Sequence, residues 1–201
     1  MKREYGLFLL ISLFLFTACT ITPKPPSKSE VSKLSREIVS LSPKNPSQKN
    51  PSPKISQSKA TIISDDIYKE VNHLTEKFSL ISPPWFHNFL VNVGLREKGL
   101  CYHWADALYI HLMQKGYSEV EFHLVGANIG EYFFEHNAIV IVGKGKNVSE
   151  GIVLDPWRNS GKLFHGTVKK DKKYQWKHRP DRGCERKFIR YMVGSSPAPT
   201  S

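Results

Sequence analysis

The chain has 201 residues, with 29 Lys and Arg against 18 Asp and Glu and a formal net charge of +11 at pH 7. This length, with 40% hydrophobic residues, is enough for one domain with a single core. An excess of positive charge indicates nucleic acid or an anionic surface as partner, and an N-terminal sequence typical of export disfavours nucleic acid.

An export signal is predicted over residues 1–18. Its basic start is followed by an apolar run over residues 7–16 that is too short to cross a bilayer as a mature helix. The run ends in "FTAC", which resembles the lipobox of bacterial lipoproteins, where the cysteine becomes the lipidated N-terminus. The resemblance implies acylation of Cys19 and a lipid anchor in the cell envelope. Thr20 after it implies sorting to the outer membrane, facing the periplasm; the alternative is an ordinary signal peptide with an incidental cysteine.

Two segments have the composition of disordered chain. Residues 19–64 are rich in Ser, Pro, Lys and Asn, and they predict a flexible tether. Within it, "VSKLSREIVSL" has the pattern of a short amphipathic helix, which we expect to form only transiently. Residues 194–201, "GSSPAPTS", predict a disordered tail. Charge is unevenly distributed, because residues 65–155 hold seven Lys/Arg against twelve Asp/Glu, whereas residues 156–201 hold twelve against three. The basic segments indicate attraction to anionic lipid or cell-wall polymer, or simply a solvated surface.

Residues 65–193 remain as one predicted domain of α+β class, with N-terminal helices packed on a small antiparallel sheet. Apolar residues at helical spacing predict one helix reaching Ile81, and a second short helix is expected over 85–96. A third helix begins at Cys101 and ends before a glycine. Strands are predicted over 119–126, 133–142 and 150–158, and the last two are expected to be antiparallel neighbours.

Three reactive side chains fall at the ends of these elements. Cys101 opens the third helix, His136 opens a strand and Asp155 closes the next strand. Neighbouring antiparallel strands bring the last two ends together at one edge of the sheet. A helix N-terminus lowers the pKa of a thiol, an imidazole can take the thiol proton, and a carboxylate can orient the imidazole. The pattern therefore predicts a nucleophilic cysteine site.

The segments "GLCYHWADAL", "EHNAIVIV" and "IVLDPW", in this order, resemble the transglutaminase-like branch of the papain-like cysteine enzymes. The resemblance implies a transglutaminase-like core in which Cys101 is the nucleophile, His136 the base and Asp155 the orienting residue. It also implies cleavage or transfer of an amide acyl group through a thioester, with hydrolysis favoured over cross-linking. Expected substrates are a peptide, a protein or the peptide part of peptidoglycan, and the residues imply no metal or organic cofactor.

The group that completes the oxyanion hole is left open by the sequence. Backbone N–H groups at the start of the third helix can contribute. Trp85, Asn88 and Asn92 are side-chain candidates. Trp157 is a candidate to shield the site from water, although an aromatic residue at such a position more often simply packs.

A non-catalytic interpretation of the same residues is also open. Once Cys19 is lipidated, Cys101 and Cys184 form an even pair in an oxidising compartment, which permits a disulfide. Cys101 would then be structural, and the protein would be an envelope lipoprotein that binds peptidoglycan or an anionic surface. No motif indicates the oligomeric state.

Overall fold

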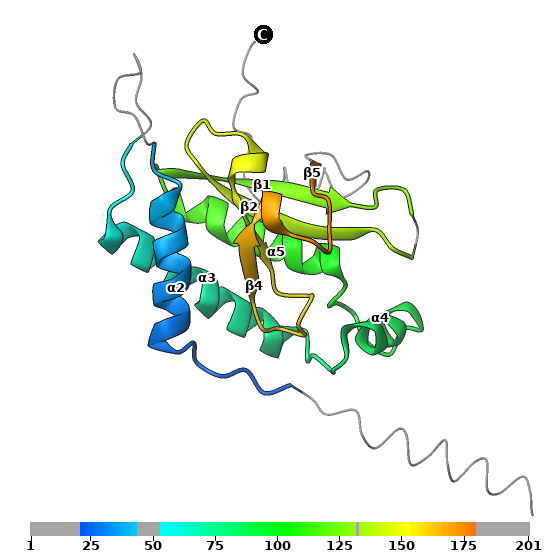
Figure 1. Cartoon of the computed structure of the whole chain (residues 1–201). Helices are drawn as coiled ribbons and strands as arrows, with labels where there is room; N and C mark the ends of the chain where they lie inside the picture. The colour runs from blue at the N-terminus through cyan, green and yellow to red at the C-terminus, as the bar shows by residue number, and fades with distance from the viewer. Residues whose placement is uncertain (1–20, 44–52, 132, 180–201) are drawn as a thin grey trace, which may run out of the picture.

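The computed structural model describes residues 21–43, 53–131 and 133–179, and within them the fold is α+β (Figure 1). The helices are α2 (Lys28–Ser40), α3 (Gln57–Lys77), α4 (Pro84–Asn92) and α5 (Cys101–Lys115), with short 3-10 turns η1 (Val148–Glu150) and η2 (Val168–Lys170). The strands are β1 (Val120–Ala127), β2 (His136–Gly143), β3 (Ile152–Asp155), β4 (Phe164–Thr167) and β5 (Lys177–His178). The predicted α+β class is confirmed.

The strands form one antiparallel sheet in the order β4-β3-β2-β1-β5. The register pairs Val140 with Val153 in the middle of β2 and β3, so the predicted pairing of these neighbours is confirmed. Because the partners run in opposite directions, the start of β2 and the end of β3 lie at the same edge. This pairing brings His136 and Asp155 together.

The two faces of the sheet are covered differently. Helices α2, α3 and α5 lie on one face, where Trp104 and Leu108 of α5 pack with Ile139 and Ile141 of β2 (Figure 1). The opposite face carries a smaller cluster of valines and Ala138, against which Phe164, Val168 and Trp176 pack. Alternate residues of β2 therefore enter two different apolar layers, which explains why its whole length is buried.

The prediction of a disordered tether over residues 19–64 is wrong for residues 28–40, which form α2. The helix begins with a capping box, because Ser27 Oγ accepts from Glu30 N and the Glu30 carboxylate accepts from Ser27 N. Leu34 and Ile38 are fully buried in the main core. Val31 packs against the same core, and these three apolar positions on one face are enough to anchor the helix, although the composition around it is polar.

The domain also begins earlier than residue 65. Helix α3 starts at Gln57, and the backbone N–H of Ile21 donates to Leu80 O at 2.9 Å, with the Ile21 side chain packed against the core. At the other end of α3, the helix stops at Lys77 instead of continuing to Ile81. The folded unit therefore includes the segment that begins at Ile21.

Several predicted element boundaries also differ from the structure. Helix α4 ends at Asn92 instead of 96, and strands β2 and β3 are shorter than expected because the chain turns before His136 and after Asp155. Strands β4 and β5 were not predicted. The predicted signal segment, Cys19, Cys184 and the tail over 194–201 lie outside the described residues. Within the described part of the chain, no helix has the length and apolar character needed to cross a bilayer.

Candidate active site

Cys101 is the first residue of α5, and the loop before it is held from two sides. His103 Nδ1 accepts from the backbone N–H groups of Gly99 and Leu100, both at 3.2 Å, which caps the start of the helix. On the other side, His87 Nδ1 accepts from Ile81 N at 3.3 Å, so its Nε2 donates to Lys98 O at 2.8 Å. The loop that leads into Cys101 is therefore held by the side chains of two histidines.

Gly99 is required by this arrangement. Its φ of +123° lies where side chains are rarely tolerated, and a Cβ built at this residue would lie 2.1 Å from His87 Nε2. The "GLC" sequence thus combines the conformation of the glycine with the first turn of the helix.

His136 and Asp155 are both buried, and His136 Nε2 donates to Asp155 Oδ2 at 2.7 Å. Asp155 also accepts from Arg158, through the guanidinium Nε at 2.9 Å and the backbone N–H at 3.1 Å. Three donors at one carboxylate favour its ionised form. Asp155 therefore holds the proton of His136 on Nε2, and Nδ1 is buried without a hydrogen-bond partner, so it is left to accept a proton.

The sulfur of Cys101 lies among polar groups of the adjoining strand end. Asn137 Nδ2 is 3.8 Å from Sγ, and Glu135 O is 3.9 Å from it. His136 also interacts with the thiol. Cys101 is a free cysteine in the structure. The sequence-predicted residues Cys101, His136 and Asp155 are therefore brought together, and Asn137 is an additional donor next to the sulfur.

The ionisation of the three groups follows from these contacts. Burial of Cys101 favours the neutral thiol, but the hydrogen bonding and charge of His136, together with Asn137, outweigh it and lower the thiol pKa below its ordinary value of 9.0. Burial of His136 favours the neutral ring, but Asp155 and Cys101 raise its pKa from 6.5 to about 9. For Asp155, burial is outweighed by His136 and Arg158, which lower its pKa. The arrangement favours a thiolate–imidazolium pair.

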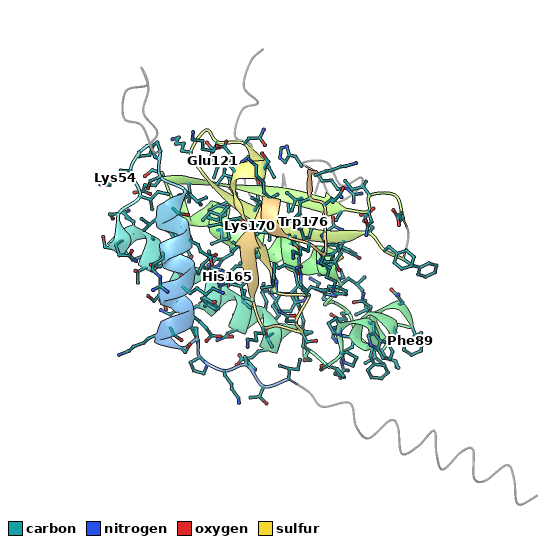
Figure 2. The ribbon with its side chains drawn as sticks, viewed as in Figure 1. Lys54, Phe89, Glu121, His165, Lys170 and Trp176 are labelled. Carbon is teal, nitrogen blue, oxygen red and sulfur yellow. The ribbon has the colours of Figure 1, made fainter. Side chains whose placement is uncertain are left out.

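Aromatic side chains enclose the imidazole. Ring centroids of Tyr174, Trp157 and Trp176 lie 4.5, 4.7 and 5.5 Å from that of His136. Trp176, labelled in Figure 2, comes from the segment that leads into β5. The predicted shielding role of Trp157 agrees with this contact, whereas Tyr174 and Trp176 were missed from the sequence. These rings keep water from the hydrogen bond between His136 and Asp155 and strengthen it.

A buried ion network supports the carboxylate from behind. The Arg158 guanidinium, only 8% exposed, bridges Asp155 and Asp171, and its two terminal nitrogens contact the Asp171 carboxylate at 3.2 and 2.7 Å. Its guanidinium carbon also lies 3.7 Å from the centroid of the Phe164 ring. Trp176 Nε1 donates to Asp171 at 2.9 Å. Arg158 follows Asp155 by three residues, so "DPWR" supplies both the orienting carboxylate and its counter-ion, a pattern that sequence inspection could have found.

The three side-chain candidates for the oxyanion hole differ in their exposure and contacts. Trp85 is 69% exposed with its ring against Phe86, and Asn92 is exposed at the end of α4. Asn88 is half-buried, and its Oδ1 accepts from Trp157 Nε1 at 3.1 Å, which ties it to the ring that contacts His136. Asn88, with the backbone N–H groups at the start of α5, is therefore the candidate that the geometry retains.

Within residues 21–43, 53–131 and 133–179, no group of three or more His, Cys, Asp or Glu side chains is arranged to hold a metal ion. Comparisons with protein-family models, with curated proteins and with solved structures found no match to this chain.

Proposed function

We propose that this protein is a cysteine hydrolase or acyltransferase that acts on an amide through a thioester on Cys101. The observation that carries the proposal is the buried hydrogen bond of 2.7 Å between His136 and Asp155, with Cys101, a free cysteine, among the groups that act on the same imidazole. The order of the three residues along the chain, and their places at a helix start and two strand ends, support a transglutaminase-like core. On this proposal the activity resides in a lipid-anchored envelope protein.

The proposed reaction has two halves, formation of a thioester on Cys101 and hydrolysis of that thioester. The Cys101 thiolate attacks the amide carbonyl carbon, and the oxyanion that forms accepts from the helix-start N–H groups and Asn88. The His136 imidazolium gives its proton to the amine as the carbon–nitrogen bond breaks, leaving a thioester. A water molecule then attacks the thioester while His136 takes a proton from it. Breakage of the carbon–sulfur bond releases the carboxylic acid and restores the pair.

Hydrolysis is the favoured outcome in this proposal, with a peptide, a protein or a peptidoglycan peptide as substrate. An amine acceptor would need the space that a water needs plus room for its own chain, and His136 is enclosed by three aromatic rings. The enclosure supports the smaller nucleophile.

The test begins with the thiol itself. Alkylation by iodoacetamide is followed across pH, with Cys101 quantified by mass spectrometry in the parent, in His136→Ala and in His165→Ala. His165 is a matched control, because it also pairs with a carboxylate, Glu37, at 2.8 Å, but is not among the groups that affect Cys101. We expect Cys101 to react well below pH 9 in the parent and in the control, and to lose this reactivity in His136→Ala.

Turnover is tested next by trapping the acyl-enzyme. The parent is incubated with a peptide mixture and with peptidoglycan peptides, and a mass increase on Cys101 is sought by mass spectrometry, with Cys101→Ser as control. A reactive thiol that never acquires an acyl group would contradict the amide proposal. A thiol unreactive near neutral pH would instead favour the non-catalytic lipoprotein.

A further inference from the structure

Large apolar side chains are exposed in two segments that adjoin the candidate site. In the described part of the chain they gather in 85–95 and 129–134, and only Ile62 and Met113 lie elsewhere. The first segment includes α4, and the second ends two residues before His136. Exposed apolar groups that gather in this way mark an interaction surface.

Helix α4 carries the more regular of the two patches. Trp85, Phe89 and Val93 follow one another at spacings of four residues and so share one face, and Leu95 continues it past the end of the helix. Phe89 is 54% exposed and is labelled at the periphery of the molecule in Figure 2. We call these four side chains the α4 surface. The sequence from Pro84 to Leu95 contains no Lys, Arg, Asp or Glu.

The position of Ile21, where the described chain begins, indicates that a lipid bilayer is what contacts the α4 surface. The backbone N–H of Ile21 donates to the carbonyl of Leu80, four residues before the first residue of α4. Cys19, the predicted lipidation position, is two residues before Ile21, so it lies within about 7 Å of it even when the chain is fully extended. A lipid on Cys19 would therefore enter the bilayer beside the α4 surface.

The side chains near this entry point suit a membrane interface. Trp and Phe are favoured at the boundary between headgroups and acyl chains. Lys24 and Lys28 are exposed in the segment that follows Ile21, where they can attract anionic headgroups. We propose that the α4 surface docks into the bilayer that carries the lipid anchor and holds the site around Cys101 at the membrane surface. This docking does not depend on the proposed catalytic activity.

The test measures vesicle binding without any lipid on the protein. The chain from Thr20 onward, which contains every residue that the structure describes, is centrifuged with vesicles of phosphatidylglycerol and phosphatidylethanolamine in high salt, so that attraction by basic residues is screened. The parent is compared with Phe89→Asp and with Ile62→Asp. Ile62 is a matched control, because it is 56% exposed on α3.

We expect the parent and Ile62→Asp to bind, and Phe89→Asp to bind about tenfold more weakly or worse, because it loses a buried aromatic ring and places a charge in the interface. Iodoacetamide reactivity of Cys101 should be equal in all three, which shows that the fold is intact. Absence of parental binding, or an equal loss in both variants, would overturn the proposal. Lack of vesicle binding combined with Phe89-dependent retention of an apolar peptide would overturn it too, in favour of a peptide groove.

Discussion

Replacement of Asp155 by Asn tests the role of the carboxylate in the site most directly. The pKa of His136 is raised from 6.5 to about 9, which corresponds to about 3 kcal/mol in favour of the imidazolium. Asp155 and Cys101 supply this stabilisation together, against the opposing effect of burial. Loss of the carboxylate charge should therefore remove a large part of it. An Asn amide can also donate to Nε2, which would place the ring proton on Nδ1 and prevent that nitrogen from accepting the thiol proton.

We expect alkylation of Cys101 at pH 7 to slow by about ten- to a hundredfold in Asp155→Asn, since about 1.4 kcal/mol changes an equilibrium tenfold. The assay is iodoacetamide labelling followed by mass spectrometry, with circular dichroism to confirm folding. Asp171→Asn is the control, because Asp171 contacts Arg158 and Trp176 but makes no hydrogen bond to His136. An unchanged rate in a folded Asp155→Asn, or an equal loss in both variants, would refute a specific role of Asp155 in orienting His136.

Three further outcomes follow from particular contacts. If the thioester chemistry operates, turnover should fall as the pH drops below the lowered pKa of Cys101, because the thiolate is protonated. Turnover should also fall above about pH 9, because His136 loses the proton that it must donate. A pH profile of peptide hydrolysis measures both decreases. Gly99→Ala should lower the melting temperature and the reactivity of Cys101, because the new Cβ meets His87; thermal unfolding and labelling would show unchanged values if the loop could relax. Leu34→Ala should cost about 2–5 kcal/mol in urea unfolding, whereas Ile62→Ala should have little effect; equal small effects would contradict a packed α2.

The three residues of the candidate site could be predicted because each lies at the boundary of a strongly patterned segment. In "HNAIVIV" a continuous, mostly β-branched apolar run begins directly after two polar residues, so the start of its strand is visible, and the apolar stripe of α5 places Cys101 in its first turn. Antiparallel pairing then leaves little freedom in where His136 and Asp155 meet. Their separation from the thiol was not predictable, because it depends on how α5 packs across the sheet.

The groups behind the site could not be predicted by the same means. Asp171, Tyr174 and Trp176 lie in a segment without helical or strand periodicity, and they are held there by contacts with Arg158 and His136. Strands β4 and β5 span only four and two residues, too few for alternation to be recognised. Such segments take their conformation from tertiary contacts rather than from local preference.

Helix α2 was considered from the sequence "VSKLSREIVSL" but was interpreted as a transient helix, although local signals for a stable one were present. Ser27 and Glu30 have the spacing of a capping box, and Val31, Leu34 and Ile38 follow at helical intervals. The Pro- and Lys-rich sequence on both sides outweighed these signals when composition was averaged over residues 19–64. An amphipathic helix needs only one apolar stripe, so its average composition can resemble that of a disordered linker.

The packing of α2 also changes how far the candidate site can lie from a membrane. A flexible linker over residues 20–64 would place the domain at a root-mean-square distance of roughly 35–40 Å from its anchor. The chain is instead hydrogen-bonded to the folded domain at Ile21. An anchor at Cys19 is therefore separated from the domain by two residues of chain, which span at most about 7 Å. A lipidated form would therefore reach only substrates that lie no farther from the bilayer than the domain itself extends. Proteins or peptides held at the membrane surface satisfy this limit, and a polymer farther away would do so only where it approaches the membrane.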